Sequence, residues 1–225
     1  MIEDIRKFKI TYILIALNLL VYLTSILYTG TIIDMPVKEL VDLGAIFGPS
    51  VALGNEWWRL ITAMFLHGGM THLLMNMFSL YIIGRPTEIY FSASLYLFLY
   101  FMTGILSGVV SIYFHPVTVA IGASGAIFGL FGALSGYFFA YRQQLGEHAQ
   151  QFMKDFALII GINLILGFSI PNIDVSAHAS GLISGLIGGY LIAKHPRKIW
   201  ILLFGTLLLL LTAYLYLPTL YADLV

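Results

Sequence analysis

The sequence predicts an all-α protein that crosses a membrane several times as a bundle of helices. Of its 225 residues, 60% are hydrophobic and only 10% are charged, whereas soluble domains average about half apolar and a quarter charged residues. The apolar residues gather in runs close to the roughly 20 residues that a helix needs to cross a bilayer. The net charge is zero, so no nucleic-acid partner is indicated. There is no cysteine, which excludes thiol catalysis and thiolate metal sites.

Seven apolar segments are expected to form transmembrane helices. They cover approximately residues 10–28, 72–90, 93–114, 124–141, 156–170, 176–193 and 200–217. The first segment lacks an Ala-X-Ala cleavage site, as expected for an anchor rather than a removable signal peptide. The fifth is the weakest, because it is short and contains the polar Asn163, so a six-span alternative stays open.

Lysine and arginine predict the orientation of these spans. If the spans alternate, most basic residues fall on one side of the membrane: Arg6, Lys7, Lys9, Arg85, Arg142, Lys154, Lys194, Arg197 and Lys198. Only Lys38 and Arg59 fall on the other side. The positive-inside rule then places the N-terminus, residues 1–9, in the cytoplasm and the C-terminus outside. We expect a multi-pass protein of the cell (plasma) membrane of a bacterium.

Two connections on the outer side are unusual. The first, about 29–71, is long, and its part from Trp57 to Phe65 is apolar and aromatic, as in a helix lying in the membrane interface. The second, 115–120, has no charged residue and contains Pro116. Irregular backbone at membrane depth is tolerated only where protein or a water-filled cavity covers it. We therefore expect this loop to dip inward, with Ser124 at the start of the following helix.

Three of the predicted helices begin on the outer side with polar residues. The second segment opens with His72 and Asn76, and their i, i+4 spacing places both on one helix face. The fourth opens with Ser124, and the sixth carries His178 near the same end. Ionisable residues within membrane helices are costly and by default indicate function. We expect these four side chains to line one site.

Glycines give the fourth and sixth segments a way to pack closely. They recur as Gly125, Gly129 and Gly132 in one segment and as Gly181, Gly185 and Gly189 in the other. Small residues at this spacing let helix backbones approach each other, which would bring Ser124 within reach of His178. Each feature alone also fits a purely structural role, in helix packing or in an interhelical hydrogen bond. Together they favour a catalytic site.

The chemistry that needs these residues is acyl transfer by a serine. Serine is a weak nucleophile and needs an adjacent base, which neutral His178 can supply. The oxyanion needs donors, for which the Ser124 backbone N–H, Asn76 and His72 are the candidates. Asp174 precedes His178 by four residues, but we expect it to be a solvated turn residue. The sequence therefore predicts a Ser–His dyad.

The pattern resembles the rhomboid family of intramembrane serine proteases. The motifs that carry the resemblance are Trp58-Arg59, His72-X-X-X-Asn76, Gly122-X-Ser124-Gly125 and Ala177-His178-X-X-Gly181-X-X-X-Gly185. The resemblance implies a six-helix rhomboid core over 10–193, followed at 194–225 by a cytoplasmic linker and a seventh transmembrane helix. It implies cleavage of transmembrane protein substrates in the bilayer, near their outer end and after a small residue. The first loop and the fifth helix would flank the path by which the substrate enters.

The resemblance also assigns supporting roles. Gly122, Gly125, Trp58 and Arg59 belong to its motifs, and it implies neither a metal nor another cofactor. Phe128 stands where the family often has a tyrosine that stacks on the histidine, and phenylalanine can stack as well. Glu88 stands where the family often has a glutamate that supports the first-loop arginine. In our topology Glu88 and Arg59 lie near opposite surfaces, so we leave Glu88 without a role.

The remaining histidines do not indicate a second site, and other functions explain the sequence less well. His67 is expected to cap the loop helix, and His115, His148 and His195 are scattered singly, without further metal ligands nearby. A rhomboid-like protein that binds transmembrane helices without cutting them is the main alternative, although such relatives usually lack the nucleophile or the base. A channel or transporter ranks last, because the spans have no acidic residue apart from Glu88 near the end of the second and show no obvious inverted repeat. The oligomeric state stays open.

Overall fold

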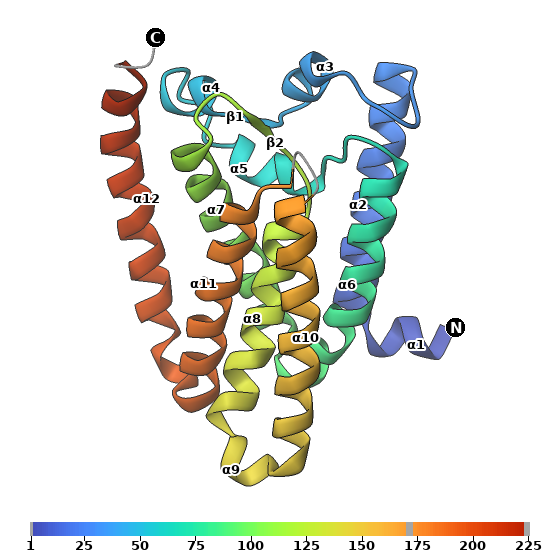
Figure 1. Ribbon diagram of the computed structural model, residues 1–225, viewed down its shortest axis with the longest axis vertical. Helices are drawn as coiled ribbons and strands as arrows, with labels where there is room; N and C mark the ends of the chain where they lie inside the picture. Colours follow the sequence, from blue (N-terminus) through green and yellow to red (C-terminus); the bar gives the residue numbers. More distant parts are fainter. Residues whose placement is uncertain (1, 170–172, 223–225) are drawn as a thin grey trace.

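The computed structural model describes residues 2–169 and 173–222 as a bundle of long helices with short elements at one end (Figure 1). The long helices are α2 (Lys9–Thr29), α6 (Met70–Tyr90), α7 (Ala93–Phe114), α8 (Ser124–Ala140), α10 (Glu147–Ser169), α11 (Val175–Lys194) and α12 (Ile199–Ala222). Each overlaps one of the seven predicted apolar segments. The short helices α1 (Ile2–Lys7), α9 (Arg142–Leu145) and η2 (Pro196–Lys198) lie between or before them.

The first loop forms a cap over one end of the bundle. Its elements are α3 (Val37–Asp42), β1 (Ile46–Phe47), α4 (Gly48–Ala52), α5 (Arg59–Thr62) and η1 (Ala63–Phe65). We call this the loop end and the opposite one, where α9 lies, the α9 end (Figure 1). The apolar stretch predicted as one interfacial helix is instead a short α-helix followed by a 3₁₀ turn.

The uncharged loop before Ser124 pairs with this cap. It contains β2 (Val119–Ala120), which is antiparallel to β1, with Ile46 opposite Ala120 and Phe47 opposite Val119. The pairing gives backbone groups of both strands a protein partner, as irregular backbone near a membrane requires. We call the pair the β1–β2 ribbon.

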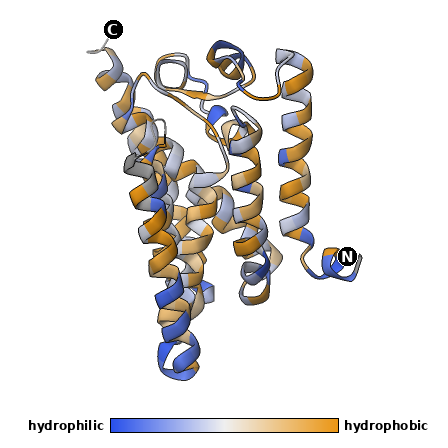
Figure 2. Cartoon of the chain, turned by 45° about the vertical axis from the view of Figure 1, so that its right-hand side comes forward, coloured by the Kyte–Doolittle hydropathy of each residue, from blue (hydrophilic) through white to orange (hydrophobic). Residues whose placement is uncertain are grey.

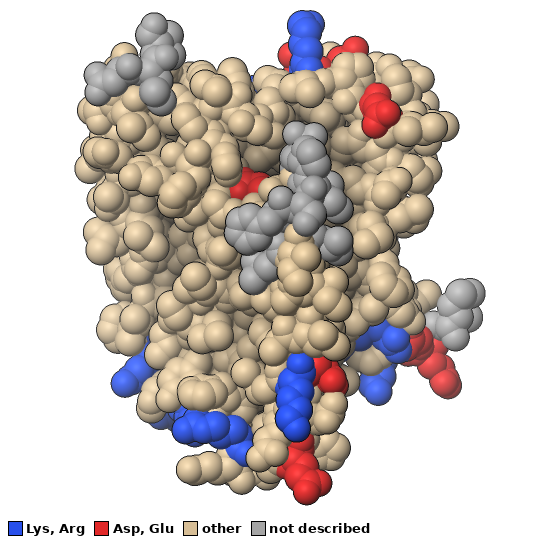
Figure 3. Space-filling view, in the orientation of Figure 1, with Lys and Arg blue, Asp and Glu red and all other residues tan. Residues whose placement is uncertain are grey.

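Helix length and composition mark the protein as an integral membrane protein. Four of the described helical stretches are long and apolar enough to cross a bilayer: Lys9–Thr29, Ala93–Phe114, Val175–Lys194 and Pro196–Ala222. Figure 2 shows that the long helices consist mostly of hydrophobic residues. On the face of the molecule drawn in Figure 3, most Lys and Arg side chains gather at the α9 end. Helix α8 is apolar but has only 17 residues. It is the central helix, in contact with α6, α7, α10 and α11.

Helix α10 differs from its predicted bounds. The prediction began at Phe156, whereas the helix begins at Glu147. The added turns are rich in polar residues (Glu147, His148, Gln150, Gln151 and Lys154), so hydrophobicity alone does not reveal them. Residue 170, the predicted end, lies outside the described residues.

Helices α8 and α11 pack backbone against backbone. A Cβ atom added at Gly185 would lie 1.9 Å from the Gly129 carbonyl oxygen, and one at Gly189 would lie 2.0 Å from that of Ala133. No side chain fits between the helices at these points. The close packing predicted from the glycine spacing is confirmed, and it fixes how the start of α8 faces the start of α11.

Candidate active site

Ser124 and His178 meet at the loop end of the α8–α11 pair. Ser124 is the first residue of α8, and His178 lies in the first turn of α11. The His178 Nε2 atom is 2.9 Å from the Ser124 Oγ atom, a hydrogen-bond distance. In the neutral imidazole with an unprotonated Nε2, the serine hydroxyl donates this bond. That is the arrangement in which a base can take the hydroxyl proton.

The turn before Ser124 requires glycine. Gly122 has a φ of +112°, a region that residues with a side chain rarely adopt. Its N–H donates to the carbonyl oxygen of Ala63, at 2.9 Å, so the turn is tied to the first loop. Gly125 also has no room for a side chain, because a Cβ there would lie 2.6 Å from that of Ser107.

Phe128 holds the imidazole of His178 by stacking. The two rings are 4.3 Å apart between centroids and inclined by only 9°. Phe128 lies one helical turn after Ser124, so the same face of α8 carries the hydroxyl and the ring that supports its partner. The stacking involves only the phenyl ring and does not require a hydroxyl group.

His72 and Asn76 border the same turn from α6. A Cβ added at Gly122 would lie 2.8 Å from His72 Nε2 and 3.7 Å from Asn76 Nδ2. The Asn76 amide also donates to the His72 carbonyl, at 3.1 Å. The structure therefore brings the four polar side chains of the predicted site together from three helices.

His67 is a buried neighbour of His72, whereas the sequence predicted only that it caps the loop helix. It is fully buried, and its ring meets that of His72 edge to face at 5.0 Å between centroids. Its Nδ1 lies 3.3 Å from the Phe65 carbonyl oxygen. Burial lowers the pKa of His67 to about 3, so the ring is neutral at physiological pH. The available signal was a histidine five residues before His72 in an apolar stretch.

Asp174 is not the solvated turn residue that we expected. Its carboxylate caps α11, accepting from the Ala177 N–H at 2.9 Å and from the Ser176 hydroxyl at 2.6 Å. His115 Nε2 lies 3.6 Å away. Burial raises the pKa of Asp174, but the hydrogen bonds of Ser111, Ser176 and Ala177 outweigh it and hold the pKa below its usual value. Asp174 thus fixes the helical turn that carries His178.

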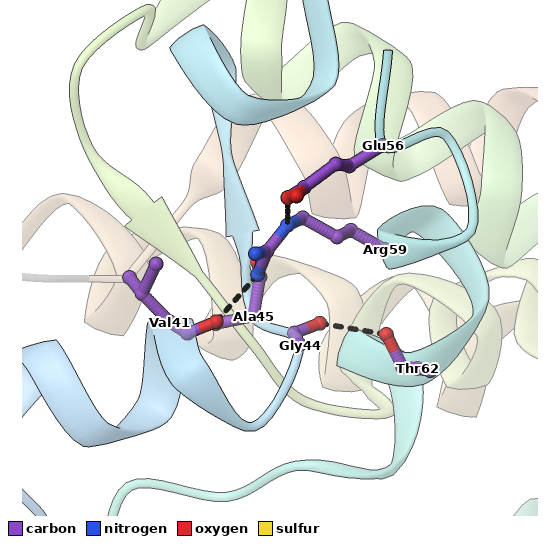
Figure 4. Close-up of polar contacts among 6 residues, drawn as sticks. All are labelled: Val41, Gly44, Ala45, Glu56, Arg59 and Thr62. Carbon is purple, nitrogen blue, oxygen red and sulfur yellow. Dashed lines mark hydrogen bonds and ion pairs between the residues drawn. The ribbon is translucent and has the colours of Figure 1, made fainter. Parts of the chain in front are cut away.

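Trp58 and Arg59 make their contacts within the first loop. The buried Arg59 guanidinium pairs with Glu56 and donates to the carbonyls of Val41 and Ala45, the latter at 3.0 Å (Figure 4). It also lies 4.7 Å from the centre of the Trp58 ring. These contacts tie α3, β1 and α5 together.

Glu88 does not pair with Arg59. Its carboxylate accepts from the backbone N–H groups of Ile10 and Thr11, at 3.1 and 2.7 Å. These are first-turn groups of α2, which have no partner within the helix. Glu88 therefore joins α6 to the start of α2, far from the first loop.

Comparison with known proteins gives a consistent family match. A family model described as the Rhomboid domain matches residues 54–195. The "RHOMBOID-like protein 6, mitochondrial" of Arabidopsis thaliana is 36% identical over 167 residues, which cover 72% of this chain and 52% of that protein. The "Rhomboid protease GluP" of Bacillus subtilis is 37% identical over 175 residues, with 78% and 33% covered. The chain thus spans about half or less of these two relatives. The "Putative rhomboid protease YdcA" of Bacillus subtilis is 32% identical over 153 residues, with 67% and 75% covered.

Proposed function

Because the chain belongs to the rhomboid family, we propose that it is an intramembrane serine endopeptidase that uses a Ser124–His178 dyad. The observation that carries the proposal is the 2.9 Å contact between His178 Nε2 and Ser124 Oγ, at the adjoining starts of two helices. Two Bacillus subtilis relatives that are named rhomboid proteases support hydrolase activity in this family. Each dyad residue sits in the motif that the family resemblance assigns to it.

The reaction follows from the position of the two groups. Ser124 Oγ attacks the carbonyl carbon of the scissile bond while His178 Nε2 takes the hydroxyl proton. The tetrahedral intermediate then collapses, the C–N bond breaks, and the imidazolium gives its proton to the leaving amine. Water attacks the resulting acyl-enzyme with His178 again as the base, which releases the second product and restores Ser124.

Three donors are available for the oxyanion. The Ser124 N–H lies at a helix N-terminus, where backbone donors have no intrahelical partner. The side chains of Asn76 and His72 border the same turn. Donors of this kind are each worth about 2.7–4 kcal/mol of transition-state stabilisation in serine proteases. We assign these roles to them, with Gly122, Gly125 and Phe128 supporting the dyad.

The proposed substrates are transmembrane proteins cut near their outer end. In this proposal the core 10–193 provides six spans and the segment 194–225 a seventh, with the basic α9 end in the cytoplasm. The dyad then lies toward the outer side. The Bacillus subtilis relatives support the membrane of a bacterial cell as its location, although plant relatives are also similar.

A comparison of serine variants tests the proposal. The full chain is reconstituted in liposomes with a panel of single-span membrane proteins, and released fragments are identified by mass spectrometry. We expect fragments with the wild type and none with Ser124→Ala. The matched control is Ser135→Ala on the same helix, which should cleave normally. The Ser135 hydroxyl donates to the Phe131 carbonyl within its own helix.

Labelling with a fluorophosphonate separates the two family functions. The wild type and Ser135→Ala should be labelled, and Ser124→Ala and His178→Ala should not. Robust labelling of His178→Ala would contradict the dyad. Absence of both labelling and serine-dependent fragments would instead favour a protein that binds transmembrane helices without cutting them.

A further inference from the structure

The last helix, α12, has no part in the chemistry above, yet its end reaches the loop end beside α4 and α7 (Figure 1). Most of its side chains are exposed. An inward stripe at four-residue spacing, formed by Ala213, Leu217 and Tyr221, is buried. These three join one apolar cluster with residues of the first loop and α7: Ile46, Val51, Ala52, Leu60, Ala63 and Ile112. The helix is therefore packed specifically against the cap and not merely appended.

The Tyr221 hydroxyl replaces a backbone hydrogen-bond donor that Pro116 lacks. In a continuing helix the carbonyl of Ile112 would accept from the N–H of residue 116. That residue is Pro116, which has no N–H. The hydroxyl of the fully buried Tyr221 lies 2.9 Å from the Ile112 carbonyl oxygen and 2.9 Å from that of Pro116. The final helix thus supplies the donor missing at the end of α7.

The same hydroxyl lies where the first loop meets the loop before β2. A Cβ added at Gly48 would be 1.9 Å from the Tyr221 hydroxyl oxygen and 2.1 Å from the Pro116 carbonyl oxygen. Gly48 directly follows β1, and Pro116 lies three residues before β2. Three segments far apart in sequence therefore converge at the end of the β1–β2 ribbon.

The cluster is linked to the nucleophile by one further bond. Ala63, a member of the cluster, accepts from the N–H of Gly122 at 2.9 Å. Gly122 is two residues before Ser124 and has the positive φ that shapes the turn. A displacement of the ribbon or of Ala63 would therefore reach the Ser124 turn through a continuous chain of backbone contacts.

We propose that Tyr221 of α12 is a positioning residue, which holds the loop 115–122 and with it the backbone that presents Ser124. The proposal rests on the proposed function only where it refers to catalysis. Its structural part, that Tyr221 holds the loop, is independent of any activity. In this proposal α12 helps to position the backbone of the candidate active site.

Two readouts on Tyr221→Phe test the proposal. The first is amide hydrogen exchange of the full chain in lipid nanodiscs, followed at residues 117–122. The second is kcat and KM for cleavage of a transmembrane substrate found with the wild type. The matched control is Tyr216→Phe, the same chemical change on the same helix, at a 52% exposed position. Within the described residues only the Tyr216 backbone carbonyl, which accepts from the Thr219 hydroxyl, makes a side-chain hydrogen bond, and the Tyr216 hydroxyl makes none.

We expect Tyr221→Phe to speed exchange at 117–122 by roughly tenfold, because a buried carbonyl pair loses its donor. Exchange within α8 should be unchanged, and kcat should fall roughly threefold to tenfold. Tyr216→Phe should alter neither. Exchange that is unchanged, or faster throughout the chain, would overturn the positioning role, and so would faster loop exchange with normal kcat. Absence of serine-dependent cleavage by the wild type would refute the proposed function and leave the exchange result to decide the structural part.

Discussion

The contact of α8 with α11 gives the sharpest prediction, because one added methyl group should separate the dyad. A Cβ at Gly181 would lie 2.2 Å from the Gly125 carbonyl oxygen, whereas real Cβ atoms keep at least 3.0 Å. In Gly181→Ala the helices must part by about 0.8 Å at this level. The His178–Ser124 distance of 2.9 Å would then rise to as much as about 3.7 Å, beyond the limit of a hydrogen bond, about 3.5 Å.

The expected loss of activity follows from that displacement. A misplacement of about 1 Å can cost roughly 100-fold in rate, so we expect kcat of Gly181→Ala to fall between tenfold and 100-fold. The free energy of unfolding should fall by about 1–3 kcal/mol, as for overpacking elsewhere. Both are measured on the full chain, kcat in liposomes and thermal unfolding in detergent.

The matched control is Gly189→Ala, two turns farther from the dyad. Its added Cβ would clash just as severely, at 2.0 Å from the Ala133 carbonyl oxygen. We expect a similar loss of stability and a much smaller loss of kcat. Equal kcat losses in the two variants would refute the local argument, and so would wild-type activity of Gly181→Ala.

Three further predictions concern the surroundings of the dyad. Phe128→Leu should lower kcat roughly twofold to tenfold, since an aromatic pair is worth about 0.5–1.5 kcal/mol. An unchanged kcat would show that the stacking of Phe128 on His178 does not contribute to catalysis. Between pH 6.5 and about 3 the unfolded chain protonates His67 and the folded chain does not, so acidification should cost about 1.4 kcal/mol of stability per pH unit. This pH dependence is checked by measuring the melting temperatures of the wild type and of His67→Asn across this range. If the melting temperatures of both proteins fall equally with pH, the prediction is contradicted. At pH 7, Asp174→Ala should lose about 0.5–2 kcal/mol of stability while Asp174→Asn keeps the cap; equal melting of the two variants would argue against capping.

Much of the helix arrangement was predictable because membrane helices carry their signal in composition. Apolar runs located the long helices, and the spacing of Gly181 and Gly185 indicated the close pair that brings His178 to Ser124. A common depth for polar residues on alternate helices then sufficed to propose the site. In each case the information lies within one helix or in the alternation of spans.

The remaining features depend on contacts that no local pattern encodes. The bond from Tyr221 to Ile112 joins residues 109 positions apart, and neither carries a signal for the other. The two-residue strands are too short for any periodicity. Asp174 did carry a local signal, because aspartate is a favoured N-cap. We misinterpreted it by assigning the residue to solvent on topological grounds alone.

The glycine contacts between α8 and α11 also determine which parts of the bundle can move. Because the backbones touch without side chains between them, we expect this pair to move as one body that carries both Ser124 and His178. Helix α10, in contrast, meets α8 through aromatic rings, such as Phe152 stacked on Phe138 at 4.0 Å, which can slide or change rotamer. Under the proposed function, we expect a substrate helix to displace α10 while the distance between Ser124 and His178 stays fixed.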